Sequence, residues 1–286
     1  MSIGYIFAIL TGIFYGIQGA FGKLLTGRMP PIILSWGIFT FTLPYMLILL
    51  LIEGIPRIIW KEFIWATTGS LILNFVSWYL FFLALQKSSL AKTMPFTSFS
   101  PLFMIPIAYI ILGEFPNPKG ILGIFLIISG AFGIYMKSSN PVDTIRNIVE
   151  EKGTRIMLIV ALTWSISATF EKVAVLNSSQ AFYGTAIEIL LSLAYLPYLF
   201  RKEYRKGRYI RRNISIFLVF GLISALMLIF QFTAIKHILV SYVIAFKRAG
   251  VIVSVLLGIL FFKEKNAVRN IISTLLMITG VFLILL

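Results

Sequence analysis

Ten long apolar segments dominate this chain of 286 residues, and each is about as long as a helix that crosses a lipid bilayer. Charged residues make up only 12% of the sequence, against about 25% in soluble domains, and the mean hydropathy is +0.97. The composition therefore predicts an all-α integral membrane protein, multi-pass, in contact with the lipid bilayer and located in the cell membrane. The apolar segments are 3–22, 32–52, 63–85, 90–112, 119–136, 155–175, 181–200, 213–235, 239–262 and 267–286.

The net charge of +15 does not indicate a nucleic-acid partner, because the cations cluster between apolar runs, where they set topology and meet anionic lipid. The chain has no cysteine and one histidine, which excludes thiolate nucleophiles and the usual zinc sites with several ligands. Motifs of metalloproteases, serine hydrolases and P-loop enzymes are also missing from the sequence. We therefore expect no enzymatic activity, no cofactor and no metal.

The sequence contains an internal duplication. Residues 84–134 align with 234–284 at a constant shift of 150, without a gap. Identical residues fall on matched positions: Phe96 and Phe246, Glu114 and Glu264, Gly130 and Gly280, and, at a shift of 149, Lys23 and Lys172. Because each copy holds five segments, an odd number, the second copy enters the membrane from the opposite face. We therefore predict ten transmembrane helices in two inverted five-helix repeats, 1–136 and 155–286, joined by a charged linker at 137–154.

The ends of the fourth and ninth segments carry a paired pattern, Ile-Ile-Leu-Gly-Glu at 110–114 and Leu-Phe-Phe-Lys-Glu at 260–264. Together with the two five-segment copies, this pattern resembles the EamA family of the drug/metabolite transporter superfamily over essentially the full length. Lys263 departs from the glycine that usually precedes the glutamate. The resemblance implies a carrier that moves a small-molecule substrate by alternating access, in a family whose members move very different solutes.

Two adjacent cations, Lys247 and Arg248, lie near the middle of the ninth segment. A cation at the centre of a spanning helix costs about 2.5–3.5 kcal/mol, so such residues face a polar cavity or an anionic partner. A substrate anion would be one such partner. An acidic side chain would be the other: Glu188 for Arg248, while Glu171 could pair locally with Lys172. Glu188 is accordingly predicted as a gating residue or counter-charge.

Other polar and aromatic residues in the apolar segments are predicted to line a shared cavity. Thr97 and Ser98 lie opposite Lys247 and Arg248 at the 150-residue shift, and Asn74 and Trp78 share a helix face because they are four residues apart. The predicted substrate-binding residues are Lys247, Arg248, Asn74, Trp78, Thr97, Ser98, Trp164 and Gln231. Gln18, Trp36, Tyr79, Tyr183 and Ser254 are further candidates for the cavity wall. Cations and aromatic walls together favour a small polar or anionic metabolite that resembles an amino acid.

Two alternatives remain open at this point. The Lys-Arg pair also resembles the plastid sugar-phosphate translocators of the same superfamily, which would make the chain a sugar-phosphate or nucleotide-sugar exchanger. A non-transporting membrane protein with a buried structural salt bridge is the other. The orientation is open as well: most Lys and Arg lie in odd-numbered loops, which places the termini outside, whereas the family resemblance places them in the cytoplasm. We expect a monomer or a weak homodimer.

Two segments show local signals for helix shape. Gly12, Gly16, Gly19 and Gly22 form a strip on the first segment, where another helix can approach closely. Three prolines, Pro95, Pro101 and Pro106, are expected to kink the fourth segment.

Overall fold

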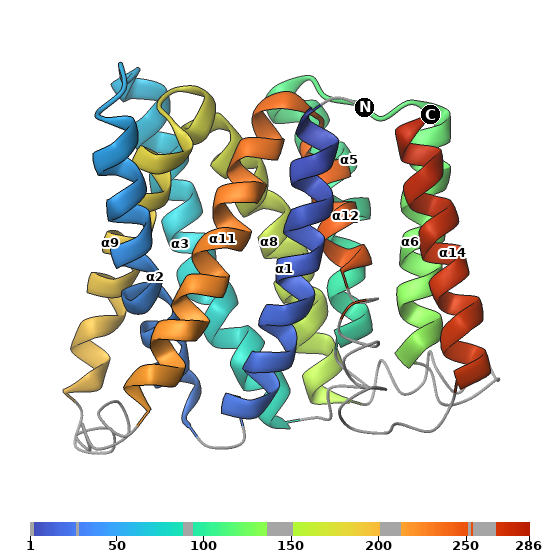
Figure 1. Ribbon diagram of the computed structural model, residues 1–286, viewed down its shortest axis with the longest axis horizontal. Coiled ribbons are helices and arrows are strands. Elements are labelled where there is room, and N and C mark those ends of the chain that lie inside the picture. Colours follow the sequence, from blue (N-terminus) through green and yellow to red (C-terminus); the bar gives the residue numbers. More distant parts are fainter. Residues whose placement is uncertain are drawn as a thin grey trace.

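The computed structural model describes residues 3–26, 29–87, 94–135, 151–200, 213–250, 253 and 267–286, and all regular structure within these ranges is helical (Figure 1). The helices are α1 (Ile3–Thr26), α2 (Pro31–Glu53), α3 (Trp60–Lys87), η1 (Met94–Phe99), α5 (Ser100–Leu112), α6 (Pro118–Tyr135), α8 (Lys152–Leu176), α9 (Gln180–Leu199), α11 (Ile214–His237), α12 (Val240–Ala249) and α14 (Ala267–Leu285). Most of the predicted linker, Ser254 and the Lys263-Glu264 pair lie outside the described residues, as do residues 201–212.

The described helices fit a multi-pass membrane protein. Five of them, α2, α3, α8, α9 and α11, are long and apolar enough to cross a membrane. Shorter apolar stretches occur at Ile3–Gln18, Phe96–Leu112, Pro118–Gly133 and Ile272–Leu285. The prediction of an all-helical, multi-pass membrane protein is therefore confirmed for the described residues.

The proline-rich fourth segment is divided into two elements. Its first turns, η1, wind as a 3-10 helix, and α5 begins directly afterwards at Ser100. Pro101 occupies the first turn of α5, where a missing N–H group costs little, whereas Pro106 lies inside the helix. The 3-10 helix has three residues per turn instead of 3.6, so the side chains of η1 leave the helical register of α5.

Helices α1 and α12 cross at a glycine contact. A Cβ atom built on Gly12 would lie 2.5 Å from the carbonyl oxygen of Phe246, and one built on Gly16 would meet the carbonyl of Gly250. The backbones are therefore in direct contact, as small-residue crossings in membranes allow. The predicted packing role is confirmed for Gly12 and Gly16.

The helices pack in matched pairs. Helix α3 packs on α8 as α11 packs on α1, and α5 packs on α8 as α12 packs on α1. Through the sequence duplication, α3 corresponds to α11 and α8 corresponds to α1, while α5 and α12 belong to the matched fourth and ninth segments. Helices α6 and α14 pair at one edge of the molecule, and α2 and α9 pair toward the other (Figure 1). The centre between them is built from both halves of the chain.

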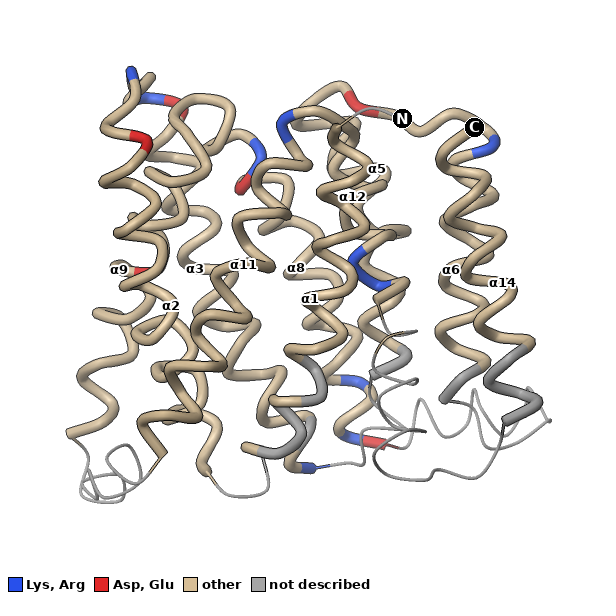
Figure 2. Tube along the Cα trace, in the orientation of Figure 1, with Lys and Arg blue, Asp and Glu red and all other residues tan. Residues whose placement is uncertain are grey.

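Charged residues gather at the two ends of the helices, and both termini lie at the same end (Figure 2). The exceptions near mid-height lie on α9, whose acidic residue is Glu188, and on α12, whose cations are Lys247 and Arg248. These exceptions locate the interior polar site.

Candidate functional site

Arg248 is the most deeply enclosed cation of the site, with 2% of its surface exposed. Its Nε donates to Ser100 Oγ at 2.9 Å, and its Nη1 donates to the hydroxyl of Tyr15 at 2.5 Å. The guanidinium carbon lies 5.1 Å from the ring centre of Tyr15 and 5.2 Å from that of Trp164. Among the described residues no carboxylate lies within ion-pair distance of Arg248. Neutral oxygens and aromatic faces therefore hold a buried positive charge.

Lys247 contacts a different group, because adjacent residues of a helix diverge by about 100°. Its Nζ donates to Gln231 Oε1 at 2.7 Å. The amide nitrogen of Gln231 donates in turn to Glu171 Oε2 at 3.0 Å. The Gln231 amide thus connects a cation of α12 with a carboxylate of α8.

Glu171 is held by further donors from two helices. Asn74 Nδ2 lies 3.1 Å from Glu171 Oε1 and 2.6 Å from Ser167 Oγ, and Ser167 donates to the same carboxylate oxygen at 3.2 Å. Hydrogen bonds to a carboxylate stabilise its charged form and fix its position. The carboxylate of Glu171 is therefore fully oriented by α3, α8 and α11.

These groups line one cavity of about 70 Å³. The cavity brings together six of the predicted substrate-binding residues, which are Asn74, Trp78, Trp164, Gln231, Lys247 and Arg248. The indole rings of Trp78 and Trp164 lie edge to face, with 5.5 Å between their ring centres, and form the aromatic wall of the cavity. Cations, one carboxylate and aromatic faces thus meet in a space bounded by both halves of the chain.

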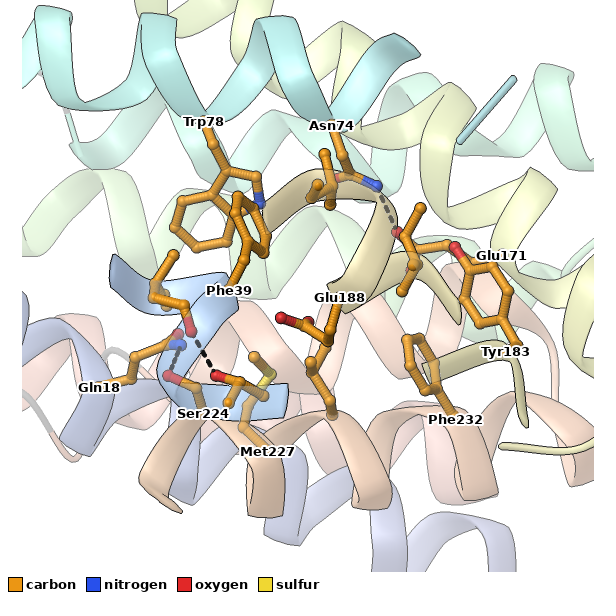
Figure 3. A pocket seen from close by; sticks show the side chains of 15 residues that line it. Gln18, Phe39, Asn74, Trp78, Glu171, Tyr183, Glu188, Ser224, Met227 and Phe232 are labelled. Atoms are coloured by element: carbon orange, nitrogen blue, oxygen red, sulfur yellow. Dashed lines mark hydrogen bonds between the residues drawn. The ribbon is translucent and has the colours of Figure 1, made fainter. Parts of the chain in front are cut away.

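A second cavity of about 40 Å³ adjoins the first, and it contains Glu188 (Figure 3). The two cavities share the residues Gln18, Asn74, Trp78, Glu171, Met227 and Leu228. The carboxyl group of Glu188 points into the space between Phe39 and Trp78 on one side and Met227 on the other (Figure 3). Glu188 is 3% exposed, and its Oε2 has no hydrogen-bond partner within the described part of the chain.

Some predicted contacts are not formed. Glu188 does not pair with Arg248, because it lines the other cavity. Glu171 does not pair with Lys172, since these neighbours point to different sides of α8. Thr97 and Ser98 are fully buried in η1 and do not line either cavity. The hydroxyl that reaches Arg248 belongs instead to Ser100, at the start of α5.

Tyr15 and Glu171 belong to the site although the sequence did not point to them as ligands. Tyr15 directly precedes Gly16 of the glycine strip, so the close approach of α12 brings its ring onto the cations. The position of Glu171 within an apolar segment was a signal for a role in the site. The same position suits a local ion pair with Lys172 equally well.

An ion pair joins Lys172 of α8 to Glu114, just after α5. Lys172 Nζ also donates to the carbonyl of Ile238 at 2.7 Å, and Glu114 Oε2 accepts from the backbone N–H of Val240 at 3.0 Å. The pair therefore ties α5 and α8 to the connection between α11 and α12. Their sequence counterparts, Lys23 and Glu264, lie outside the described side chains. We call this group the Lys172–Glu114 latch.

Comparisons with known proteins agree with the fold. The profile of the EamA-like transporter family matches residues 2–136 and again residues 152–286. An uncharacterized transporter of Methanothermobacter thermautotrophicus is 22% identical over 308 residues, which cover 98% of this chain and 85% of that protein. A crystal structure shares the fold with a TM-score of 0.75 at 15% identity, over 98% of this chain and 95% of that one. Because the two profile matches together span most of the chain, this protein belongs to the EamA-like transporter family.

Proposed function

We propose that this protein is a secondary carrier of a small polar or anionic metabolite that resembles an amino acid. One observation carries the proposal: Arg248 is a buried cation on the wall of a cavity, and it has no carboxylate partner among the described residues. A buried charge without a counter-ion is costly. An anionic group of a substrate that enters the cavity supplies that counter-ion.

The cavity suits a zwitterion better than a simple anion. The planar guanidinium of Arg248 is shaped to bind a carboxylate through two hydrogen bonds. Glu171 lines the same cavity and offers a negative charge to an ammonium group. The rings of Trp78 and Trp164 supply apolar faces for a side chain. Asn74 and Gln231 complete the proposed binding set by holding Glu171 and Lys247 in place.

The proposed mechanism is alternating access between two inverted five-helix repeats. The matched packing of α3 on α8 and α11 on α1 supports a two-fold relation between the halves. The Lys172–Glu114 latch would close one entrance while the other opens, because it joins elements of both repeats. The site would then face each side of the cell membrane in turn.

A second candidate is an exchanger of sugar phosphates or nucleotide sugars. The adjacency of Lys247 and Arg248 in one cavity favours it, because a phosphate with two negative charges would engage both cations. Glu171 weighs against it, since a carboxylate in the same cavity repels such a ligand.

A thermal-shift screen of the purified protein separates the candidates. Amino acids, organic acids and phosphorylated sugars are added one at a time, and counterflow in proteoliposomes is then measured for each stabilising compound. We expect stabilisation and saturable counterflow with an amino acid. Stabilisation by phosphorylated sugars alone would select the exchanger, and a flat response to all three classes would contradict a carrier of either kind.

A further inference from the structure

The cavity that contains Glu188 has an electrostatic character opposite to that of its neighbour. Its lining includes two carboxylates, Glu171 and Glu188, and no lysine or arginine among the residues that the structure describes. Glu171 is compensated by Asn74, Ser167 and Gln231, whereas Glu188 Oε2 accepts no hydrogen bond from any described residue. Within the described part of the chain, Arg248 is thus a buried cation without a carboxylate partner, and Glu188 is a buried carboxyl group whose Oε2 has no hydrogen-bond donor. The two residues line adjoining cavities.

We propose that Glu188 is a proton-binding site, and that binding of the substrate's anionic group at Arg248 drives proton uptake there. This inference rests on the carrier function proposed above and adds the coupling ion. When both carboxyl groups are ionised, Lys247 and Arg248 balance the charges of Glu171 and Glu188. A bound anion adds one negative charge to this region, and one proton on Glu188 restores the balance. Substrate anion and proton therefore bind together and cross the membrane together.

The surroundings of Glu188 fit a proton better than a metal cation. A sodium ion needs a shell of several oxygen atoms, but the other polar side chains that line this cavity already take part in hydrogen bonds with protein groups. Gln18 donates to Ser224, Thr42 donates to the carbonyl of Ile38, and the Tyr183 hydroxyl bonds to Ser70. A proton requires a single acceptor oxygen, and Glu188 Oε2 supplies it.

The charged and titratable groups around Glu188 define how it responds to pH. Within the cavity these are Glu171 on α8 and the Tyr183 phenol on α9, while the residues from α1, α2, α3 and α11 carry no ionisable group. Lys247 and Arg248 line the adjoining cavity beyond the shared wall. Removing a cation from that cavity favours the protonated form of Glu188, because a nearby positive charge stabilises the carboxylate.

The test uses dicyclohexylcarbodiimide, an apolar reagent that enters membranes and adds to protonated carboxyl groups. The acid O–H adds across one C=N bond of the reagent, and the adduct rearranges to a stable N-acylurea without a leaving group. Purified protein in lipid nanodiscs is treated in mildly acidic and mildly alkaline buffer, and peptide masses locate the adduct. No transport substrate is needed, so the result is independent of whether the carrier proposal holds.

We expect an adduct on Glu188 in acidic buffer that decreases in alkaline buffer. The Glu188→Gln variant should lose this adduct. The control variant Glu53→Gln, which changes a carboxyl group at an exposed helix end, should retain the adduct on Glu188. Lys247→Met should keep Glu188 reactive in more alkaline buffer than the parent protein. The wild-type measurement alone is decisive if a variant fails to fold. An adduct on Glu171 in place of Glu188, a yield that does not change with pH, or an unchanged response in Lys247→Met would overturn the proposal.

Discussion

In the proposed mechanism the Lys172–Glu114 latch closes one entrance, so neutralising Glu114 should open it. The substitution Glu114→Gln preserves shape but removes the charge that faces Lys172, while the carbonyl oxygen of glutamine can still accept from Val240 N–H. Hydrogen bonds to charged groups contribute about 1.5–3 kcal/mol, which converts to an increase of roughly 10- to 100-fold in the open population. The magnitude is large because the side chains of Lys172 and Glu114 are only 7% and 15% exposed.

The assay exploits the lack of native cysteine, which makes a single introduced thiol an unambiguous reporter. Ser241, next to the latch on α12, is 1% exposed, so Ser241→Cys should react slowly with a membrane-impermeant thiol reagent. The rate of reaction then follows the open population. We expect Glu114→Gln to raise this rate by about 10- to 100-fold.

Two controls isolate the latch. Lys236, which is exposed, lies at the same end and donates to Gln180, so Lys236→Met should change the rate by less than about fivefold. Adding Lys172→Met to Glu114→Gln should raise the rate by less than Lys172→Met does alone, because both substitutions remove the same ion pair. A rate in Glu114→Gln equal to that of the parent protein would refute the role of the ion pair in closure.

Three further substitutions test the packing and the binding set. Gly12→Ala should lower the apparent melting temperature in detergent, because its Cβ meets the backbone of α12 and the overpacking costs about 1–3 kcal/mol. Gly133→Ala should cost less, because its nearest neighbour is a rotatable side chain. Gln231→Leu should weaken amino-acid binding by roughly 10- to 100-fold in calorimetry, since it removes hydrogen bonds to two charged groups; unchanged affinity would contradict its bridging role. Trp164→Ala should weaken binding by about 0.5–2 kcal/mol, and Trp164→Phe, which keeps a ring beside Arg248, should restore most of the loss.

The sequence predicted the elements that carry the site, because apolar run length is a strong signal for membrane helices. It also placed Asn74 and Trp78 on one helix face, and both line the same cavity. The glycine strip gave the close approach of α1 but not its partner, since any helix with a small residue could have packed there. Local patterns thus determine helices and faces, whereas the partner of each face depends on the assembled fold.

The pairing of charges could not be predicted in the same way. Glu188 and Arg248 have opposite charge at similar depth, yet the rotation of α9 about its axis turns Glu188 toward the second cavity. A sequence contains no direct information about that rotation. The 150-residue shift placed Ser98 opposite Arg248, but the 3-10 winding of η1 changes the helical register, so Ser100 makes the contact.

Substrate counterflow in proteoliposomes by the Arg248→Ala variant tests the anion site most directly. The amino acid that stabilises the wild-type protein most in the thermal-shift screen serves as the labelled substrate, and size-exclusion profiles confirm that the variant is folded. The proposed mechanism predicts that Arg248→Ala abolishes counterflow, and that Arg248→Lys, which keeps the charge but loses the planar fork, retains part of it. Counterflow by folded Arg248→Ala at the wild-type rate would contradict the assignment of Arg248 as the anion site.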